Sequence, residues 1–181
     1  MDQSDRFLVD AYLKGDIAAF ETLVSRYEGP LLRYAGRLVA DPNLAQDVVQ
    51  ESFLRLIREV RGIDHVEDLS VWLYRVCRNA SIDVVRKEAR MRKTHERAQA
   101  LKPELSPTPD PVEAREAESI VQRELDSLPA RQRDVLLLRV QQRKSYSEIS
   151  SMTGLTEGNV GYLIHHGLRD LAQRLRAAGV L

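Results

Sequence analysis

Hydrophobic and polar positions follow a helical period along most of the chain. In residues 44–60, for example, apolar side chains recur every three to four positions, which places them in one stripe along a helix. No segment of the sequence shows the strict two-residue alternation of a half-buried strand. The pattern therefore predicts an all-α protein.

Helix boundaries in the first half are marked by glycine and capping residues. A first helix is expected to stop at Gly15, and Asp16 is expected to cap a second helix that begins at Ile17. The sequence "EGP" at 28–30 is expected to break or kink this second helix, because proline removes a backbone donor.

The next two helices are predicted from their apolar stripes. Asn43 is expected to cap the first of them, whose stripe is Ala45, Val48, Val49, Phe53, Leu56, Ile57 and Val60. After a loop at 61–70, the second is expected to pack inward through Leu69, Trp72, Leu73, Val76, Cys77 and Ala80.

A Pro-rich polar stretch, "KPELSPTPDP" at 102–111, interrupts the helical pattern. Proline disfavours helix both at its own position and at the residue before it. The stretch predicts two small helical domains, 1–93 and 112–181, joined by a linker at 94–111.

The second half carries strong signals for helix starts and for one tight turn. Capping residues or prolines precede its predicted helices, and a glycine separates the last two. These residues are Asp110 with Pro111, Pro129, Ser145 with Glu148, Gly154, and Thr156. The last helix is expected to face the core through Val160, Ile164, Leu168, Leu171 and Leu175. Two short helices around a glycine turn are typical of a helix-turn-helix that binds DNA, and also of ordinary helical hairpins.

Composition excludes several classes of function. The single Cys77 rules out an internal disulfide and a multi-cysteine metal site, and the four histidines are too scattered to form one. No Ser/His/Asp, Cys/His or glycine-rich phosphate motif is present, so we expect no catalysis, cofactor or metal. No apolar run approaches a membrane span and the start is acidic, which predicts a cytoplasmic protein without membrane insertion.

The distribution of charge is more informative than its sum, because 27 basic and 27 acidic residues cancel. Residues 75–93 contain seven basic and two acidic residues, which gives a net charge of plus five. A solvated helix face would explain this run, but Trp72 and Tyr74 lie beside it, and single-stranded bases stack on aromatic side chains next to cations. By contrast, residues 156–170 of the last helix carry a net charge of minus one.

Three stretches, in this order, resemble one protein family. They are "DVVQESFLRL" at 47–56, "WLYRVCRNASIDVVRKEAR" at 72–90 and "LDSLPARQRDVLLLRVQQRKSYSEISSMTGLTEGNV" at 125–160. Together they resemble a bacterial sigma factor of the sigma-70 family, in the small extracytoplasmic-function (ECF) group that keeps only the second and fourth conserved regions. The resemblance covers nearly the whole chain.

The resemblance implies partners for these stretches. Asp47, Gln50 and Glu51, which alone would be only the wet side of a helix, match the face that meets the clamp helices of the largest subunit of core RNA polymerase. The fourth region would contact the flap of the second-largest subunit. Residues implied for the minus-10 element of promoter DNA are Arg61, Asp64, His65, Trp72, Arg75, Arg78, Asn79, Arg86, Lys87 and Arg90. Those implied for the minus-35 element are Thr156, Glu157, Asn159, Tyr162, His165, His166 and Arg169.

The chain departs from the family pattern in two places. Leu44 and Gln46 stand where carboxylates are common, so core binding is expected to be weak or to depend on phosphorylation or a helper protein. In the last helix, Lys or Arg is common at the positions of Gly161, Leu163, His166 and Leu168, so its minus-35 affinity is expected to be low. An anti-sigma factor or a kinase is a further expected partner.

The sequence thus favours a promoter-specificity subunit that performs no chemistry itself. Two alternatives remain open: a dimeric helix-turn-helix regulator that never acts as a sigma subunit, and a helical interaction protein that touches no DNA. The second alternative leaves the basic run from Arg75 unexplained.

Overall fold

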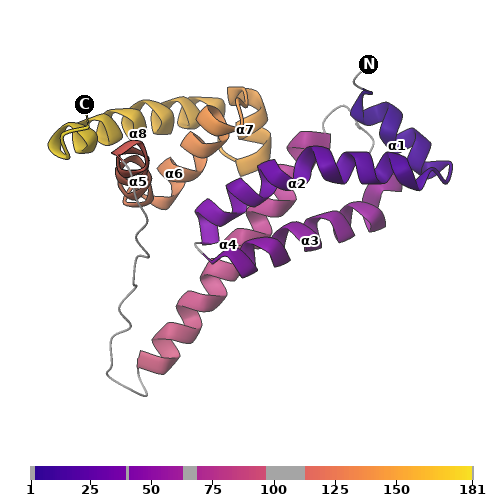
Figure 1. The fold of residues 1–181 in the computed structure, drawn as a ribbon, viewed down its shortest axis with the longest axis horizontal. Coiled ribbons are helices and arrows are strands. Elements are labelled where there is room, and N and C mark those ends of the chain that lie inside the picture. The colour runs from indigo at the N-terminus through magenta and orange to yellow at the C-terminus, as the bar shows by residue number, and fades with distance from the viewer. Residues whose placement is uncertain (1–2, 40, 63–68, 97–112, 181) are drawn as a thin grey trace. The chain divides into compact units, whose positions relative to one another are not determined.

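The structure is a computed structural model that describes residues 3–39, 41–62, 69–96 and 113–180. Every regular element in these ranges is helical, which confirms the all-α prediction (Figure 1). The chain divides into two compact units, chiefly residues 1–88 and chiefly residues 89–181. The expected domain boundaries at 93 and 111 remain predictions: α4 continues past residue 93 to Glu96, and residues 97–112 lie outside the described ranges.

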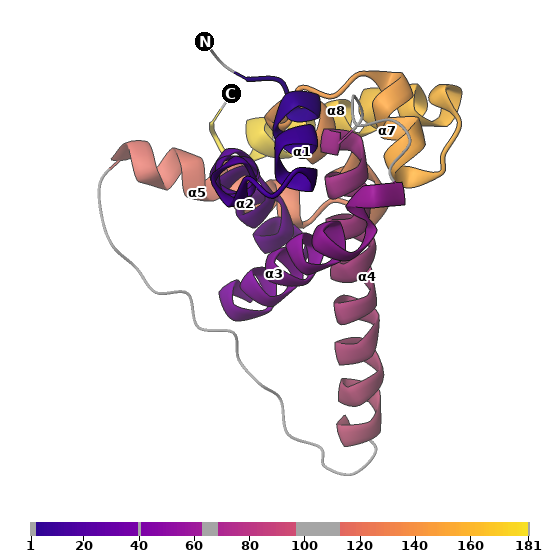
Figure 2. The same cartoon turned by 90° about the vertical axis from the view of Figure 1, so that its right-hand side faces the viewer.

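The elements follow one another in two groups. The first group is α1 (Asp5–Leu13), α2 (Ile17–Val39), α3 (Pro42–Glu59), the 3-10 turn η1 (Val60–Gly62) and α4 (Leu69–Glu96). The second group is α5 (Glu113–Asp126), α6 (Ala130–Leu136), the π-helical turn η3 (Leu137–Gln141), α7 (Tyr146–Thr153) and α8 (Glu157–Ala177). Figure 2 shows α4 as a long helix that continues beyond the end of α3.

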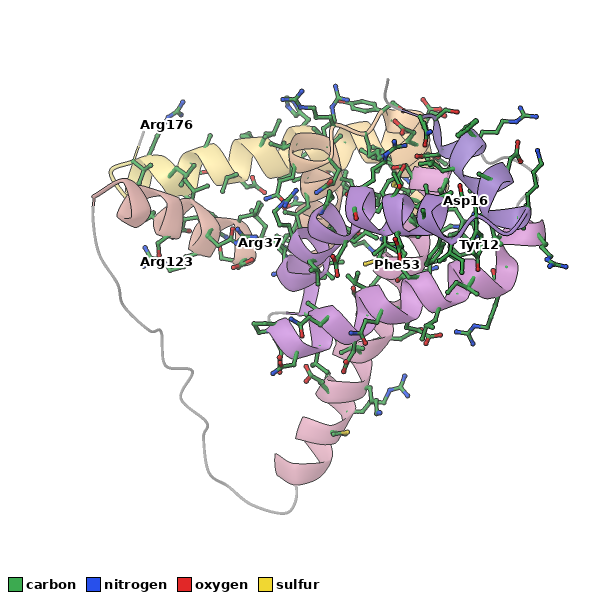
Figure 3. All side chains as sticks on the ribbon, turned by 45° about the vertical axis from the view of Figure 1, so that its right-hand side comes forward. Tyr12, Asp16, Arg37, Phe53, Arg123 and Arg176 are labelled. Atoms are coloured by element: carbon green, nitrogen blue, oxygen red, sulfur yellow. The ribbon has the colours of Figure 1, made fainter. Side chains whose placement is uncertain are left out.

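The first helix is attached to α2 by an aromatic contact and by a partly buried polar cluster. The rings of Tyr12 and Phe20 lie 4.9 Å apart between centroids, near the point where Figure 3 labels Tyr12. The Asp5 carboxylate accepts hydrogen bonds from the guanidinium of Arg26 and the hydroxyl of Tyr27. Burial is the largest cause that raises the pKa of Tyr27, and the Asp5 carboxylate raises it further. The phenol therefore stays protonated and keeps donating its hydrogen bond.

The core of the first unit is formed by α2, α3 and α4. Tyr34 of α2 is fully buried and its ring meets that of Tyr74 of α4 edge-on at 5.3 Å. The thiol of Cys77 lies between Ser52 of α3 and Ser81 of α4, and burial raises its pKa to about 12. Cys77 is therefore a core residue and not a nucleophile.

Two expectations about helix boundaries in this unit are wrong. The sequence at 28–30 does not break α2, which runs through Pro30, because Tyr27, Leu31 and Tyr34 bury one continuous face across it. Asp41, and not Asn43, caps α3: its carboxylate accepts from the backbone N–H of Asn43 at 2.8 Å, and Pro42 takes the first helical position.

The helix caps predicted elsewhere are confirmed. Asp16 accepts from the backbone N–H of Ala18 at 3.1 Å at the start of α2. Ser145 and Glu148 form a reciprocal capping box on α7, with distances of 2.7 and 3.2 Å. The predicted start at Asp110 and Pro111 lies outside the described residues.

In the second unit, α5 and α6 pack against α8. Gly167 of α8 is buried so closely against α6 that a Cβ there would lie 2.9 Å from Cδ1 of Leu136.

Two residues that were predicted to lie in the core are exposed. The contact at Gly167 replaces the one expected at Leu168, which is 46% exposed, so the prediction of Leu168 as a core residue is wrong. The same prediction for Ile57 of α3 is also wrong, since it is 42% exposed: each helix turns a narrower face inward than its apolar positions suggest.

Two glycines of α8 provide a matched test of this packing. We expect Gly167→Ala to lower the free energy of unfolding by about 1 kcal/mol, because overpacking against Leu136 outweighs the gain in helix propensity. Gly158→Ala has open space around its new methyl group and is expected to be neutral or stabilising. Urea denaturation of both variants measures the difference, and equal stabilities would contradict the close approach.

Candidate polymerase and nucleic-acid interfaces

The α3 polar face consists of Asp47, Gln50, Glu51 and Leu54. Their spacing of three and four residues places them on one side of α3, opposite the buried stripe, and all four are exposed. Glu51 is paired with Arg58 at 2.5 Å, so its carboxylate is held along the helix, whereas Asp47 makes no hydrogen bond or ion pair within the described residues. The face offers one unengaged carboxylate and one amide next to an apolar side chain.

Leu54 is the member of this face that the sequence reasoning missed. Its side chain is 53% exposed although its neighbours Phe53 and Leu56 are buried. The signal was available, because Leu54 lies three residues after Glu51 and outside the apolar stripe. A single exposed leucine is common on protein surfaces, so Leu54 adds apolar area to this face without identifying a partner.

The α4 basic face consists of Arg75, Asn79, Arg86 and Arg90. These residues are spaced by four, seven and four positions, so they lie along one side of the helix, and all are exposed. Asp83 pairs with Arg86 at a long 3.8 Å in an exposed setting, which weakens that cation's field only slightly. The row extends for roughly 22 Å at 1.5 Å per residue, a length suited to a nucleic-acid backbone.

Other residues predicted for the minus-10 element are placed differently. Trp72 and Arg78 are half-buried at the edges of the basic face, and Arg78, like Arg90 of the face itself, already has an interaction within the protein. Lys87 is exposed, but it follows Arg86 directly and so points about 100° away. Arg61 is exposed in η1, whereas Asp64 and His65 lie outside the described residues.

The residues predicted for the minus-35 element lie on α8. Thr156 caps the helix by accepting from the backbone N–H of Asn159 at 3.3 Å, as predicted. Glu157 and Asn159 are exposed in the first turn, and Gly154, with a φ of 72°, makes the turn from α7. The geometry is a helix-turn-helix with the first turn of its second helix uncovered within the unit.

Further along α8, the predicted residues form a small cluster. The Tyr162 and His166 rings lie 4.1 Å apart, and those of His165 and His166 lie 5.6 Å apart. Arg169 approaches Nδ1 of His166 at 2.8 Å and Asp170 at 3.8 Å. Arg169, the one basic residue among residues 156–170, is thus paired within the helix. This part of α8 therefore offers even less positive charge to DNA than its sequence indicates.

The described part of the chain was searched for metal-binding clusters and for membrane-spanning helices. No group of three or more His, Cys, Asp or Glu side chains could hold a metal ion among the residues searched. Within the same residues, every helix is too short or too polar to cross a membrane.

Each of the two units contains a segment that matches the model of a known protein family. The model for Sigma-70 region 2 matches residues 23–91, and that for Sigma-70, region 4 matches residues 118–171. The chain is 34% identical to the ECF RNA polymerase sigma factor SigL of Mycobacterium tuberculosis, over 91% of this chain and 93% of that protein. It is 28% identical to the ECF RNA polymerase sigma factor SigW of Bacillus subtilis, over 90% and 92%.

Solved structures show the same fold. The sigma factor RpoE of Bartonella quintana, in complex with the anti-sigma factor NepR, superimposes with a TM-score of 0.71 at 18% identity, over 87% of this chain and 96% of that one. CnrH, in complex with the cytosolic domain of CnrY, gives a TM-score of 0.71 at 22% identity, over 97% and 99%. With both family regions in order along the sequence, the chain belongs to the sigma-70 family of RNA polymerase sigma factors, in the ECF group.

Proposed function

We propose that this sigma factor, which directs transcription initiation, divides its work between three helices. The α3 polar face docks on the clamp helices of core RNA polymerase, α4 holds the opened minus-10 element, and α8 reads the minus-35 element. The observation that carries the proposal is the α4 basic face within the part of the chain that matches region 2. The protein performs no chemistry itself, and it acts in the cytoplasm with the polymerase.

The docking role of α3 rests on what its exposed side can offer. Asp47 and Gln50 can accept and donate hydrogen bonds, and Leu54 supplies apolar area beside them. Because Glu51 is already paired with Arg58, Asp47 is the carboxylate available to a basic partner. The contact has few charges, which supports the expectation of weak core binding.

The role of α4 rests on the physics of an opened strand. Extruding a base from the duplex costs a few kcal/mol of unstacking and unpairing free energy. Stacking of the base on the protein and neutralisation of the backbone phosphates must offset this cost. Arg75, Arg86 and Arg90 supply a row of cations for the phosphates, and the half-buried Trp72 lies at its edge with part of its ring accessible. The face can therefore favour the single-stranded state.

The role of α8 is one of selectivity more than of affinity. Asn159 and Glu157 in the exposed first turn can bind adenine and cytosine, respectively, in the major groove. The local pairing of Arg169 leaves little charge for phosphates. The fourth region also contacts the polymerase flap in this proposal, which would hold α8 near the promoter at high effective concentration.

A regulatory protein completes the proposal. In the two superimposable structures, the sigma factor RpoE is in complex with the anti-sigma factor NepR, and CnrH is in complex with the cytosolic domain of CnrY. An anti-sigma factor that covers the α3 polar face would control access to the polymerase, whereas a kinase finds no acceptor hydroxyl on this face, because Ser52 of α3 is buried.

Transcription of genomic DNA in vitro tests the function on every promoter of a genome at once. Core polymerase is incubated with genomic DNA with and without the chain, and the 5′ ends of the RNA are sequenced. We expect new start sites that share two upstream elements. Their absence at every salt concentration, together with tight polymerase-free binding to symmetric half-sites, would favour a dimeric regulator instead.

The docking surface is tested by removing one carboxylate at a time from α3. Asp47→Ala is expected to weaken core binding by about 1 kcal/mol, roughly fivefold in Kd, because it loses a charged hydrogen bond. Glu59→Ala is the matched control, since Glu59 pairs with Arg55 on another side of the same helix. Fluorescence anisotropy of labelled chain with core polymerase gives both values, and equal losses would contradict the assignment.

The strand-binding role of α4 is tested by truncating Arg75 of the basic face and Arg78 at its edge. Arg75→Ala and Arg78→Ala are expected to reduce promoter opening roughly fivefold, by about 1 kcal/mol, with core affinity nearly unchanged. Permanganate reactivity of unpaired thymines at the minus-10 element measures opening. Arg55→Ala on α3 is the control, and thermal unfolding checks Arg78→Ala because that side chain is half-buried. Unchanged opening in both variants would refute the role of α4.

A further inference from the structure

The turn between η3 and α7 carries a concentration of positive charge. Residues 139–144 read "RVQQRK", with three basic side chains and no acidic one. The π-helical turn η3 ends α6 here, with the backbone N–H of Gln142 bonded to the carbonyl of Leu137 at 3.2 Å. In α8, residues 157–170 contain one basic and two acidic side chains. The turn is therefore the more cationic of the two segments.

Two of the three cations in this turn are committed to holding it. The guanidinium of Arg139 donates to the carbonyl of Lys144 at 2.9 Å and lies 5.4 Å from the centroid of the Tyr146 ring. The ammonium of Lys144 pairs with Glu148 at 3.2 Å and is largely buried. Both charges are therefore used within the protein.

Arg143 differs from its neighbours in two respects. Its side chain is exposed and makes no hydrogen bond or ion pair with any residue that the structure describes. Its backbone φ is 53°, in the left-handed region that favours glycine, and no other non-glycine residue in the described ranges has a positive φ. The chain therefore has an arginine at a position where glycine would be less strained, and the guanidinium of this arginine is not paired with any described residue.

The turn adjoins the exposed side of α8. A Cβ on Gly161 would lie 3.3 Å from Cε2 of Tyr146, so the first residue of α7 packs on the second turn of α8. Arg143 precedes Tyr146 by three residues. When the second helix of a helix-turn-helix lies in the major groove, the first helix braces the DNA backbone beside it. If α8 docks in the major groove in this way, the Arg143 guanidinium would lie near one of the two phosphate strands that border the groove.

We propose that Arg143 binds a DNA phosphate beside the minus-35 element and supplies affinity that α8 lacks. Arg139 is a positioning residue, because it fixes the Lys144 carbonyl and the Tyr146 ring and so sets where Arg143 leaves the turn. The inference rests on the proposed function of α8 as a reader of duplex DNA, and it assigns the backbone contact to a segment outside α8.

The test compares three variants of the full chain on a fluorescein-labelled duplex of random sequence. Anisotropy is measured over a series of NaCl concentrations. Arg143→Gly is expected to lower the log-log salt slope by about 0.9 and to weaken binding roughly eightfold near 0.1 M salt. Arg143→Lys keeps the charge and is expected to retain the slope. The unfolding midpoint of Arg143→Gly should equal or exceed that of the parent, because glycine accepts the positive φ.

Arg176→Gln is the matched control. Arg176 is exposed in the last turn of α8, about 22 Å along the helix from Gly161, and its substitution removes the same charge from the same unit (Figure 3). Equal losses of slope for Arg143→Gly and Arg176→Gln would overturn the inference, as would an unchanged slope for Arg143→Gly. Genomic transcription with the parent chain is scored separately, so new start sites together with such a result would leave the sigma-factor role intact.

Discussion

The close approach of α8 to α6 at Gly167 determines which side of α8 remains outside. With no side chain at this position, the helix lies against Leu136, and Val160 and Ile164 follow into the core along the same face. This orientation of α8 about its own axis leaves the side chain of Tyr162 61% exposed and that of Leu168 46% exposed. The side of α8 that would meet DNA in the proposed function thus depends on the absence of a side chain at Gly167, and its low charge follows from the residues that occupy it.

An equivalent constraint acts on α3. Its buried stripe runs through Val48, Val49 and Ser52, and the hydroxyl of Ser52 bonds to the Val48 carbonyl at 2.7 Å, so this polar group adds no unsatisfied donor to the core. Burying one side requires the other to meet solvent or a partner. The same packing that stabilises the unit therefore presents Asp47 and Gln50 together.

Local signals predicted the fold well, because caps and apolar periods act over a few residues. The caps at Ser145 and Thr156 were visible in the sequence, as was the all-helical character. Tertiary packing overrode local preference at Pro30, which α2 accommodates because its flanks are buried. The roles of Gly167 and Leu168 could not be read from the period alone, because these positions, about 100° apart, flank the same apolar stripe on its two sides, and only contact with α6 distinguishes them.

Charge is distributed unevenly between the two units, and this bears on how the protein would find a promoter. The α4 basic face is long and exposed, whereas Arg169, the one basic residue among residues 157–170 of α8, is paired with His166 and Asp170. Phosphate contacts dominate nonspecific affinity, so duplex binding by the second unit alone should be weak. If the polymerase tethers both units, weak contacts still suffice, because the second binding step becomes intramolecular. Low intrinsic affinity of α8 then favours selectivity by the holoenzyme over binding by the free protein, since only a promoter that satisfies both units holds the complex.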